Sequence, residues 1–264
     1  MLGGELEANL DFADDDGATP ACIAAQEEKV ACLKVLADLG ADLDAATHDG
    51  ATPASVAAKM GSSVTLEVLG ALGANLDAPG AGLPSQHHRG GGAGGGGLGG
   101  GSLSRNGLGP GGGGKRVAPA HIAAFCGHAG ALRTLWRLGA NVEAREEHGA
   151  TPVFVAAANN QVESLVCLSS DLGCNLDRAT FDGIAPVHIA AANDQIAALQ
   201  CLHDLGADLD VTTTEGMTAA VVAAKVRRRV VLLKRKDFSS LHALVGWLVG
   251  WLVGWLVCCC MGNV

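Results

Sequence analysis

One stretch of the chain has the spacing of a phosphate-binding loop. Residues 109–116 read GPGGGGKR. Gly109, Gly114 and Lys115 fit the pattern G-x-x-x-x-G-K, in which backbone N–H groups and a lysine hold phosphate oxygens. That chemistry also needs a Ser or Thr after the lysine to bind magnesium, and Arg116 stands there. A run of glycines meets this spacing by composition alone, so a nucleotide-binding enzyme is only a distant alternative.

The cysteines do not form a metal-binding pattern, because no C-x-x-C pair recurs at zinc spacing. Cys167 and Cys201 stand at the same distance after the proline of their own copy of a recurring segment. Val35 and Val68 take that place in earlier copies, which predicts that the two cysteines are small core residues. No set of nucleophile, base and acid stands out. The sequence therefore predicts no catalytic residue, no metal and no cofactor.

These residues belong to a segment that recurs along the chain. The decapeptide DGATPACIAA at 16–25 returns as DGATPASVAA at 49–58. A dipeptide of the Thr-Pro type recurs at steps that are equal to within one position. One step is twice as long, and it crosses the Gly-rich residues 79–114. The dipeptide begins at Thr19, Thr52, Ala118, Thr151, Ala185 and Thr218. A regular period of about 33 residues indicates a stack of structural repeats.

Each copy predicts two helices followed by a turn. Thr19 can cap a first helix, and Pro20 can take its first position, where a backbone N–H has no partner in the helix anyway. Apolar residues at helical spacing predict a second helix over residues 30–39, which ends at Gly40. Asp-Gly pairs mark the turns between copies. One such unit cannot bury its own apolar face, but stacked units can.

The motif DGATPxxxAA, the second helix and LGADLDA at this period resemble the ankyrin repeat. The resemblance covers roughly residues 8–78 and 115–224. It implies an all-α solenoid of helix-turn-helix units with β-hairpin loops, interrupted by a Gly-rich linker and followed by an apolar C-terminal helix. The family's histidine two residues after the proline stands only at His121 and His188. The resemblance implies a structural hydrogen bond for both.

The expected organisation has four segments. Residues 1–78 hold N-terminal repeats, the first of them incomplete, and residues 79–114 form a Gly-rich flexible linker. Residues 115–236 hold C-terminal repeats, the last one degenerate, and residues 237–264 form an apolar tail. We expect residues 1–78 to unfold first, because the helices at 19–38 have no complete repeat before them and the linker removes the neighbour beyond residue 78.

The resemblance also implies a function. Ankyrin repeats generally bind other proteins through the tips of their hairpins and the exposed side of the first helix of each pair. Carried over to this chain, the binding positions are His48, Asp49, Lys59, Met60, Phe125, Cys126, Glu147, His148, Asn159, Phe181, Asp182, Asn193 and Glu215. Phe125 and Phe181 are either exposed binding anchors or side chains packed against an adjacent repeat.

The charge distribution bears on the partner. Residues 1–224 carry 11 Lys and Arg against 26 Asp and Glu, whereas residues 225–264 carry 7 against 1. An acidic body predicts a protein partner with a basic patch, no nucleic acid and no small-molecule substrate. The N-terminus lacks the basic and apolar regions of a signal peptide, which predicts a cytoplasmic or nuclear protein with reduced cysteines.

The tail leaves three interpretations open. Residues 243–261 contain no charge and would span about 28 Å as a helix, close to the thickness of a bilayer's hydrocarbon core. Basic residues at 227–236 would hold the repeats on the cytosolic side of such an anchor. The alternatives are an unselected tail, because GWLV repeats three times, and a soluble helix docked on the stack.

Overall fold

The computed structural model describes residues 9–15, 17–80 and 117–225, and all structural statements below concern these residues. The helices come in pairs, an inner helix followed by an outer helix. The inner helices are α1 (Pro20–Gln26), α3 (Pro53–Met60), α5 (Pro119–Cys126), α7 (Pro152–Ala158), α9 (Pro186–Ala192) and α11 (Ala219–Lys225). The outer helices are α2 (Val30–Asp38), α4 (Ser63–Ala71), α6 (Ala129–Arg137), α8 (Val162–Val166), which continues into the π-helix η1 (Cys167–Asp171), and α10 (Ile196–Asp204).

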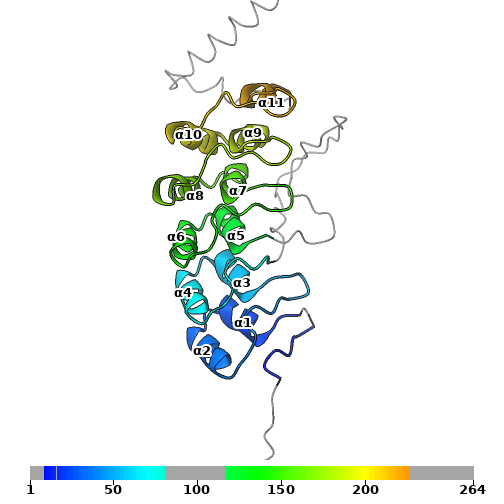
Figure 1. Cartoon of the computed structure of the whole chain (residues 1–264), viewed down its shortest axis with the longest axis vertical. Helices are drawn as coiled ribbons and strands as arrows, with labels where there is room; N and C mark the ends of the chain where they lie inside the picture. Colours follow the sequence, from blue (N-terminus) through cyan, green and yellow to red (C-terminus); the bar gives the residue numbers. More distant parts are fainter. Residues whose placement is uncertain (1–8, 16, 81–116, 226–264) are drawn as a thin grey trace, which may run out of the picture. The chain divides into compact units, whose positions relative to one another are not determined.

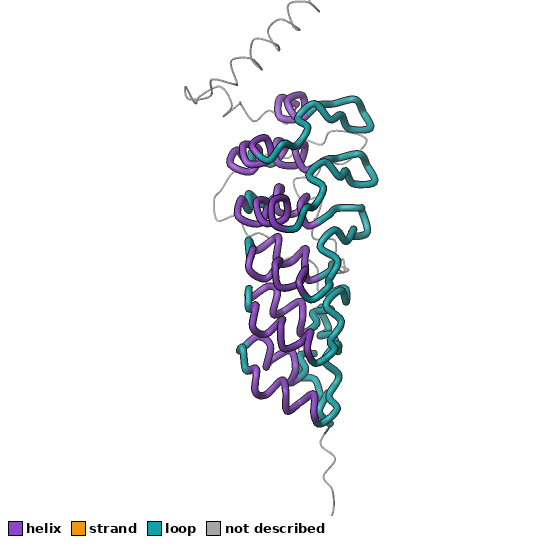
Figure 2. The backbone as a smooth tube through the Cα atoms, turned by 60° about the vertical axis from the view of Figure 1, so that its left-hand side comes forward, coloured by secondary structure: helices purple, strands orange, loops and turns teal. Residues whose placement is uncertain are grey.

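The pairs stack into two layers (Figure 1). Each inner helix packs against the next inner helix, and each outer helix packs against the next outer helix. The connecting loops project on one side of the helices (Figure 2). The described residues contain no strand, and their one isolated bridge joins Gly80 to Val117. The predicted helix-turn-helix solenoid is confirmed.

The predicted helix starts are also confirmed. The hydroxyl of Thr19 accepts a hydrogen bond from the backbone N–H of Cys22, and Thr52 and Thr151 cap α3 and α7 in the same way. Ala185 has no such side chain at the start of α9. Its backbone N–H donates instead to Nδ1 of His188, 3.0 Å away.

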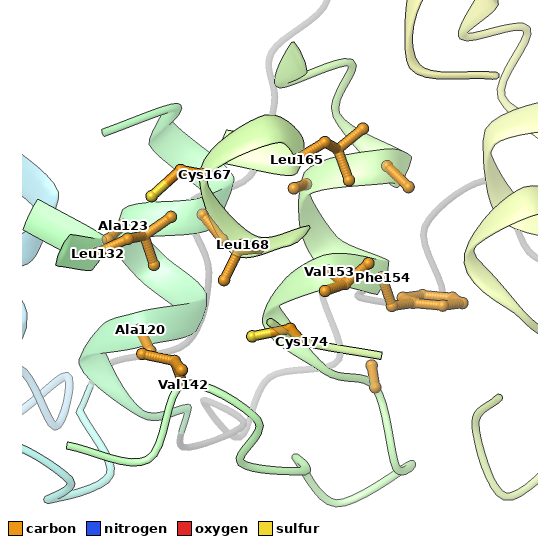
Figure 3. Close-up of a cluster of buried hydrophobic side chains, with 14 of the residues drawn as sticks. Ala120, Ala123, Leu132, Val142, Val153, Phe154, Leu165, Cys167, Leu168 and Cys174 are labelled. Atoms are coloured by element: carbon orange, nitrogen blue, oxygen red, sulfur yellow. The ribbon is translucent and has the colours of Figure 1, made fainter. Parts of the chain in front are cut away.

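The core lies between the two layers. Small residues such as Ala120 and Ala123 let the inner helices approach closely, and leucines such as Leu132 and Leu168 fill the space from the outer helices (Figure 3). All of these side chains are buried. The predicted core cysteines, Cys167 and Cys201, are buried as well.

The repeats on the two sides of the Gly-rich run pack directly against each other. Helix α3 packs on α5 and α4 packs on α6. Gly80 N–H donates to Val117 O at 2.9 Å, as Thr47 N–H donates to Ala51 O in an uninterrupted loop. In the order of the sequence, residues 81–116 therefore correspond to the three loop residues 48–50 of the preceding repeat. The segment is longer than those three residues by one period. The expectation that residues 1–78 lack a neighbour on this side is wrong.

Hydrogen bonds between repeats continue across this interruption. The backbone N–H of Asn141 donates to Asp77 Oδ1 at 2.9 Å, just as Asn75 N–H donates to Asp44 Oδ1 at 2.8 Å in the preceding interface. Nε2 of His128 donates to Lys59 O at 3.1 Å. Between the next two repeats, Gln161 makes the same contact to Phe125 O at 2.9 Å. The interface across residues 81–116 thus has the geometry of an ordinary interface between repeats.

One repeat is a single residue longer than the others, and η1 accommodates the extra residue. The step from Pro152 to Pro186 exceeds the step from Pro119 to Pro152 by one position. The outer helix of this repeat widens into η1 at residues 167–171. A π-helical turn holds one more residue than an α-helical turn, so the flanking contacts keep their register.

The turn between the paired helices gives a first prediction. Its key position has positive φ and holds Gly61 and Gly127 in two repeats, but Glu28 at φ +54° in the first. A side chain raises the energy of this backbone conformation. We expect Glu28→Gly to raise the free energy of unfolding by about 0.5–1 kcal/mol in thermal or urea denaturation. Glu27→Gly is the control, because Glu27 has φ −86° and the same exposure class. An equal gain from both variants would contradict this explanation.

The predicted tail helix and residues 81–114 of the predicted Gly-rich linker lie outside the described residues, and the boundaries of the four segments stay predictions. Among the helices that are described, none is long and apolar enough to cross a membrane.

Candidate protein-interaction surface

Each loop has a tip of three residues, of which the first two are exposed. The tips are residues 48–50, 147–149, 181–183 and 214–216. Each tip ends in a glycine with positive φ, whose N–H closes a turn. Gly50 N–H, for example, donates to Thr47 O at 2.8 Å. The tips lie along the side of the stack on which the loops project (Figure 2).

Neighbouring tips pack on one another through their glycines. A Cβ on Gly17 would lie 2.4 Å from His48 N, and a Cβ on Gly149 would lie 2.9 Å from Phe181 N. Gly183 leaves the same space for Thr214. In these three places the first residue of a tip lies over the glycine of the preceding loop, which fixes the position of that tip.

Most of the predicted binding residues are exposed. The exposed ones are His48, Asp49, Lys59, Met60, Glu147, His148, Phe181, Asp182 and Glu215. They belong to the tips or to the C-terminal end of α3. Phe125, Cys126, Asn159 and Asn193 are half-buried at the ends of inner helices. Asn193 Nδ2 donates to Ala158 O at 3.1 Å, so this side chain connects two repeats. The assignment of these positions to a partner stays a prediction.

Phe181 is held in place although its ring is exposed. The side chain is 66% exposed. Its backbone N–H donates to His148 O at 3.0 Å, and the guanidinium of Arg145 lies 4.6 Å from the ring centroid. Arg145 is fixed by hydrogen bonds to Gly149 O and Ala179 O. Arg145 was missed by sequence reasoning, because its role depends on a contact between two loops.

The tips carry negative charge. Asp49, Glu147, Asp182 and Glu215 place one exposed carboxylate on every tip named above. Other carboxylates, such as those of Asp44 and Asp77, accept hydrogen bonds from backbone N–H groups of the next repeat. The acidic charge of the body is thus used in two ways, one structural and one on the surface.

The two buried histidines connect inner helices to the following loops. Nε2 of His121 donates to Ala150 O at 3.1 Å, and Nε2 of His188 donates to Met217 O at 3.0 Å. Burial lowers the pKa of both imidazoles below the usual 6.5. Both act as the structural residues that the resemblance implied.

These histidines predict a loss of stability in acid. Above about pH 6.5 both are neutral in the folded and the unfolded chain, so they add no pH dependence. Below that pH the unfolded chain takes up protons that the folded chain excludes. The free energy of unfolding should then fall, by up to about 1.4 kcal/mol per pH unit for each histidine, until the lower folded-state pKa is reached. Urea denaturation between pH 7.5 and 5 measures this fall.

The control for this prediction is the double variant His121→Ser and His188→Ser, because Ser55 takes the same place in another repeat. We expect a lower stability at neutral pH but a flatter profile in acid. A double variant that loses as much stability as the parent chain between pH 7.5 and 5 would show that other groups cause the loss.

Two observations on the described residues bear on metal and thiol chemistry. No group of three or more His, Cys, Asp or Glu in this part of the chain could hold a metal ion. Burial raises the pKa of the Cys174 thiol to about 11, and the carboxylate of Glu143 adds to the effect. Such a thiol stays protonated and unreactive at neutral pH. The GPGGGGK stretch lies outside the described residues.

Comparisons with known proteins agree with the repeated architecture. Residues 2–79 match the family model for ankyrin repeats in three copies. The fold is similar to the crystal structure of the human ASB11 ankyrin repeat domain, with 23% sequence identity, a TM-score of 0.61 and 82% of each chain covered. No curated protein matches the chain. Residues 2–79 thus match ankyrin repeats by sequence, and the described residues have the fold of an ankyrin repeat domain.

Proposed function

We propose that the chain is a non-catalytic scaffold that binds a partner protein through the hairpin tips and the adjoining ends of the inner helices. Ankyrin repeats are generally protein-protein interaction modules. The observation that carries the proposal is the set of exposed tips, of which His48, Phe181 and Thr214 each begin one that is seated on the glycine of the preceding loop. Tips held in this way lose little conformational freedom when a partner binds, which favours affinity.

The charge of the tips supports a basic partner. Asp49, Asp182 and their neighbours repeat one carboxylate per tip, and Arg145 is already bonded to loop carbonyl oxygens. A basic surface would meet these carboxylates in sequence along the stack. Association should then become slower as salt is added, since screening weakens long-range attraction.

Site-specific photo-cross-linking tests the proposal. A photoreactive residue at Asp49 or Asp182, on the tips, is compared with one at Lys34 or Gln200, on the outer helices. All four positions are exposed, so reactivity alone does not distinguish them. We expect discrete cross-linked products in cells from the tip positions only. Equal products from both sets, or products from the outer helices alone, would contradict the proposed surface.

A second candidate is a tail-anchored scaffold that presents the same surface to the cytosol. Its support is the uncharged stretch 243–261 and the basic cluster at 227–236 that precedes it. We expect the full chain to sediment with membranes and to resist carbonate extraction, and a chain ending at Ala224 to stay in the supernatant. If the full chain stays in the supernatant as well, the protein is a scaffold without an anchor.

A further inference from the structure

The further inference concerns the chemistry of the partner, and it rests on the proposed function. It starts from Phe181, because an apolar ring that is 66% exposed needs an explanation on a surface otherwise made of polar tips. The ring has defined contacts with the preceding loop. Arg145 lies over it at 4.6 Å, and Gly149 has no Cβ that would push it away. The ring is thus presented to solvent in one position, as binding anchors commonly are.

The neighbouring tips supply acid on both sides of this ring. Glu147 stands on the preceding tip, Asp182 follows Phe181 in its own tip, and Glu215 stands on the next tip. All three are exposed. Arg145 places its positive charge over the ring, but its N–H groups are engaged by Gly149 O and Ala179 O. A ligand that fits this surface brings an apolar group to Phe181 and positive groups to the flanking tips.

The spacing of the tips sets the spacing of those groups. Packed helices lie roughly 8–10 Å apart, and the inner helices carry the tips at that interval. In the polyproline II conformation three residues make one turn and span roughly 9 Å, so side chains three residues apart lie on the same side of the peptide. One step from tip to tip therefore corresponds to three residues of a peptide in the polyproline II conformation.

From this geometry we infer that the partner presents a segment in the polyproline II conformation, in which a large apolar residue is flanked, three residues away on each side, by Lys or Arg. The apolar side chain packs on the open face of Phe181. The basic side chains reach the carboxylates of Glu147 and Glu215, and Asp182 adds to the attraction near the centre. The segment runs along the row of tips, and either direction fits because the pattern is symmetric.

Fluorescence anisotropy with labelled peptides tests this inference on the full chain. The probe is KSTLTSK, which has the inferred spacing. One control is KLSTTSK, which has the same composition but a displaced leucine, and the other is ESTLTSE, which reverses the charge. We expect KSTLTSK to bind at least roughly fivefold more tightly than KLSTTSK, and ESTLTSE not to bind.

Variants locate the site. We expect Phe181→Ala to weaken binding of KSTLTSK by roughly tenfold and Phe181→Leu by less, because leucine keeps an apolar contact. Phe12→Ala is the matched control, since Phe12 is 73% exposed and lies off the tips, and it should leave the affinity unchanged. Glu147→Gln should weaken binding and reduce its salt dependence. Thermal unfolding of each variant checks that the stack stays folded.

Three results would overturn the inference: no binding of KSTLTSK up to about 1 mM, equal binding of the two spacings, or an unchanged affinity in Phe181→Ala. These results would leave the proposed function standing if the cross-links from Asp49 and Asp182 still form. Loss of those cross-links would instead reject the tips as the interaction surface.

Discussion

Leu66→Ala is expected to lower the free energy of unfolding of the stack by about 2–5 kcal/mol. Leu66 is fully buried in α4, at the repeat that precedes the insertion. Truncation removes apolar contacts and leaves a cavity between the layers. Because α4 packs on α6 and α3 packs on α5, the loss should reach residues 117–225 as well as residues 9–80. Urea denaturation gives the magnitude, and hydrogen exchange shows which residues open together.

The control for Leu66→Ala lies on the same helix. Val64 is 61% exposed, so Val64→Ala should change the free energy of unfolding by less than about 0.5 kcal/mol. If Leu66→Ala loosens residues 9–80 while exchange in residues 117–225 is unchanged, the two groups of repeats are independent, and the packing across the insertion does not couple them.

Local chemistry made much of the fold predictable from the sequence. A threonine cap such as Thr52, the proline after it and a glycine such as Gly40 each act within a few residues, so the sequence alone reveals them. The regular period then requires stacking, because a single pair of helices cannot bury its apolar side. The buried cysteine positions followed from the same register.

The packing across the insertion could not be predicted in this way. Residues 81–116 are longer than a normal tip by one full period. The spacing of the dipeptides is therefore the same whether the flanking repeats pack on each other or leave room for one repeat between them. The deciding contacts, such as Asn141 N–H to Asp77 Oδ1, join residues 64 positions apart. The π-helical turn at 167–171 could not be predicted either, because a period that is longer by one position does not show where the extra residue lies.

The candidate surface was predictable in outline only. Tip positions such as Asp49 and Asp182 follow from the period and are exposed. The two interpretations of Phe181 both describe part of the structure, since its ring contacts Arg145 of the preceding loop and remains mostly exposed. The Asn193 side chain, in contrast, donates to Ala158 O of the preceding repeat. Whether such a side chain forms this bond or faces solvent depends on residues that are distant in sequence.

Replacing residues 81–116 by a tip of three residues, His-Asp-Gly as at 48–50, should stabilise the protein. Gly80 and Val117 already form the hydrogen bond that closes such a tip, at 2.9 Å. Shortening the loop in this way reduces the entropy cost of closing it by about 2 kcal/mol. For a chain of this size the midpoint of thermal unfolding should rise by roughly 4–8 °C.

Thermal unfolding of this shortened chain, followed by hydrogen exchange of the folded form, tests the central structural claim most directly, namely that the repeats form one continuous stack. The claim predicts a single unfolding transition at a higher temperature, with slow exchange kept in α3, α4, α5 and α6. Three residues can join Gly80 to Val117 only if the two residues are neighbours, as their hydrogen bond indicates. A lower midpoint together with fast exchange in α3 and α4 would show that they are not neighbours and would contradict the claim.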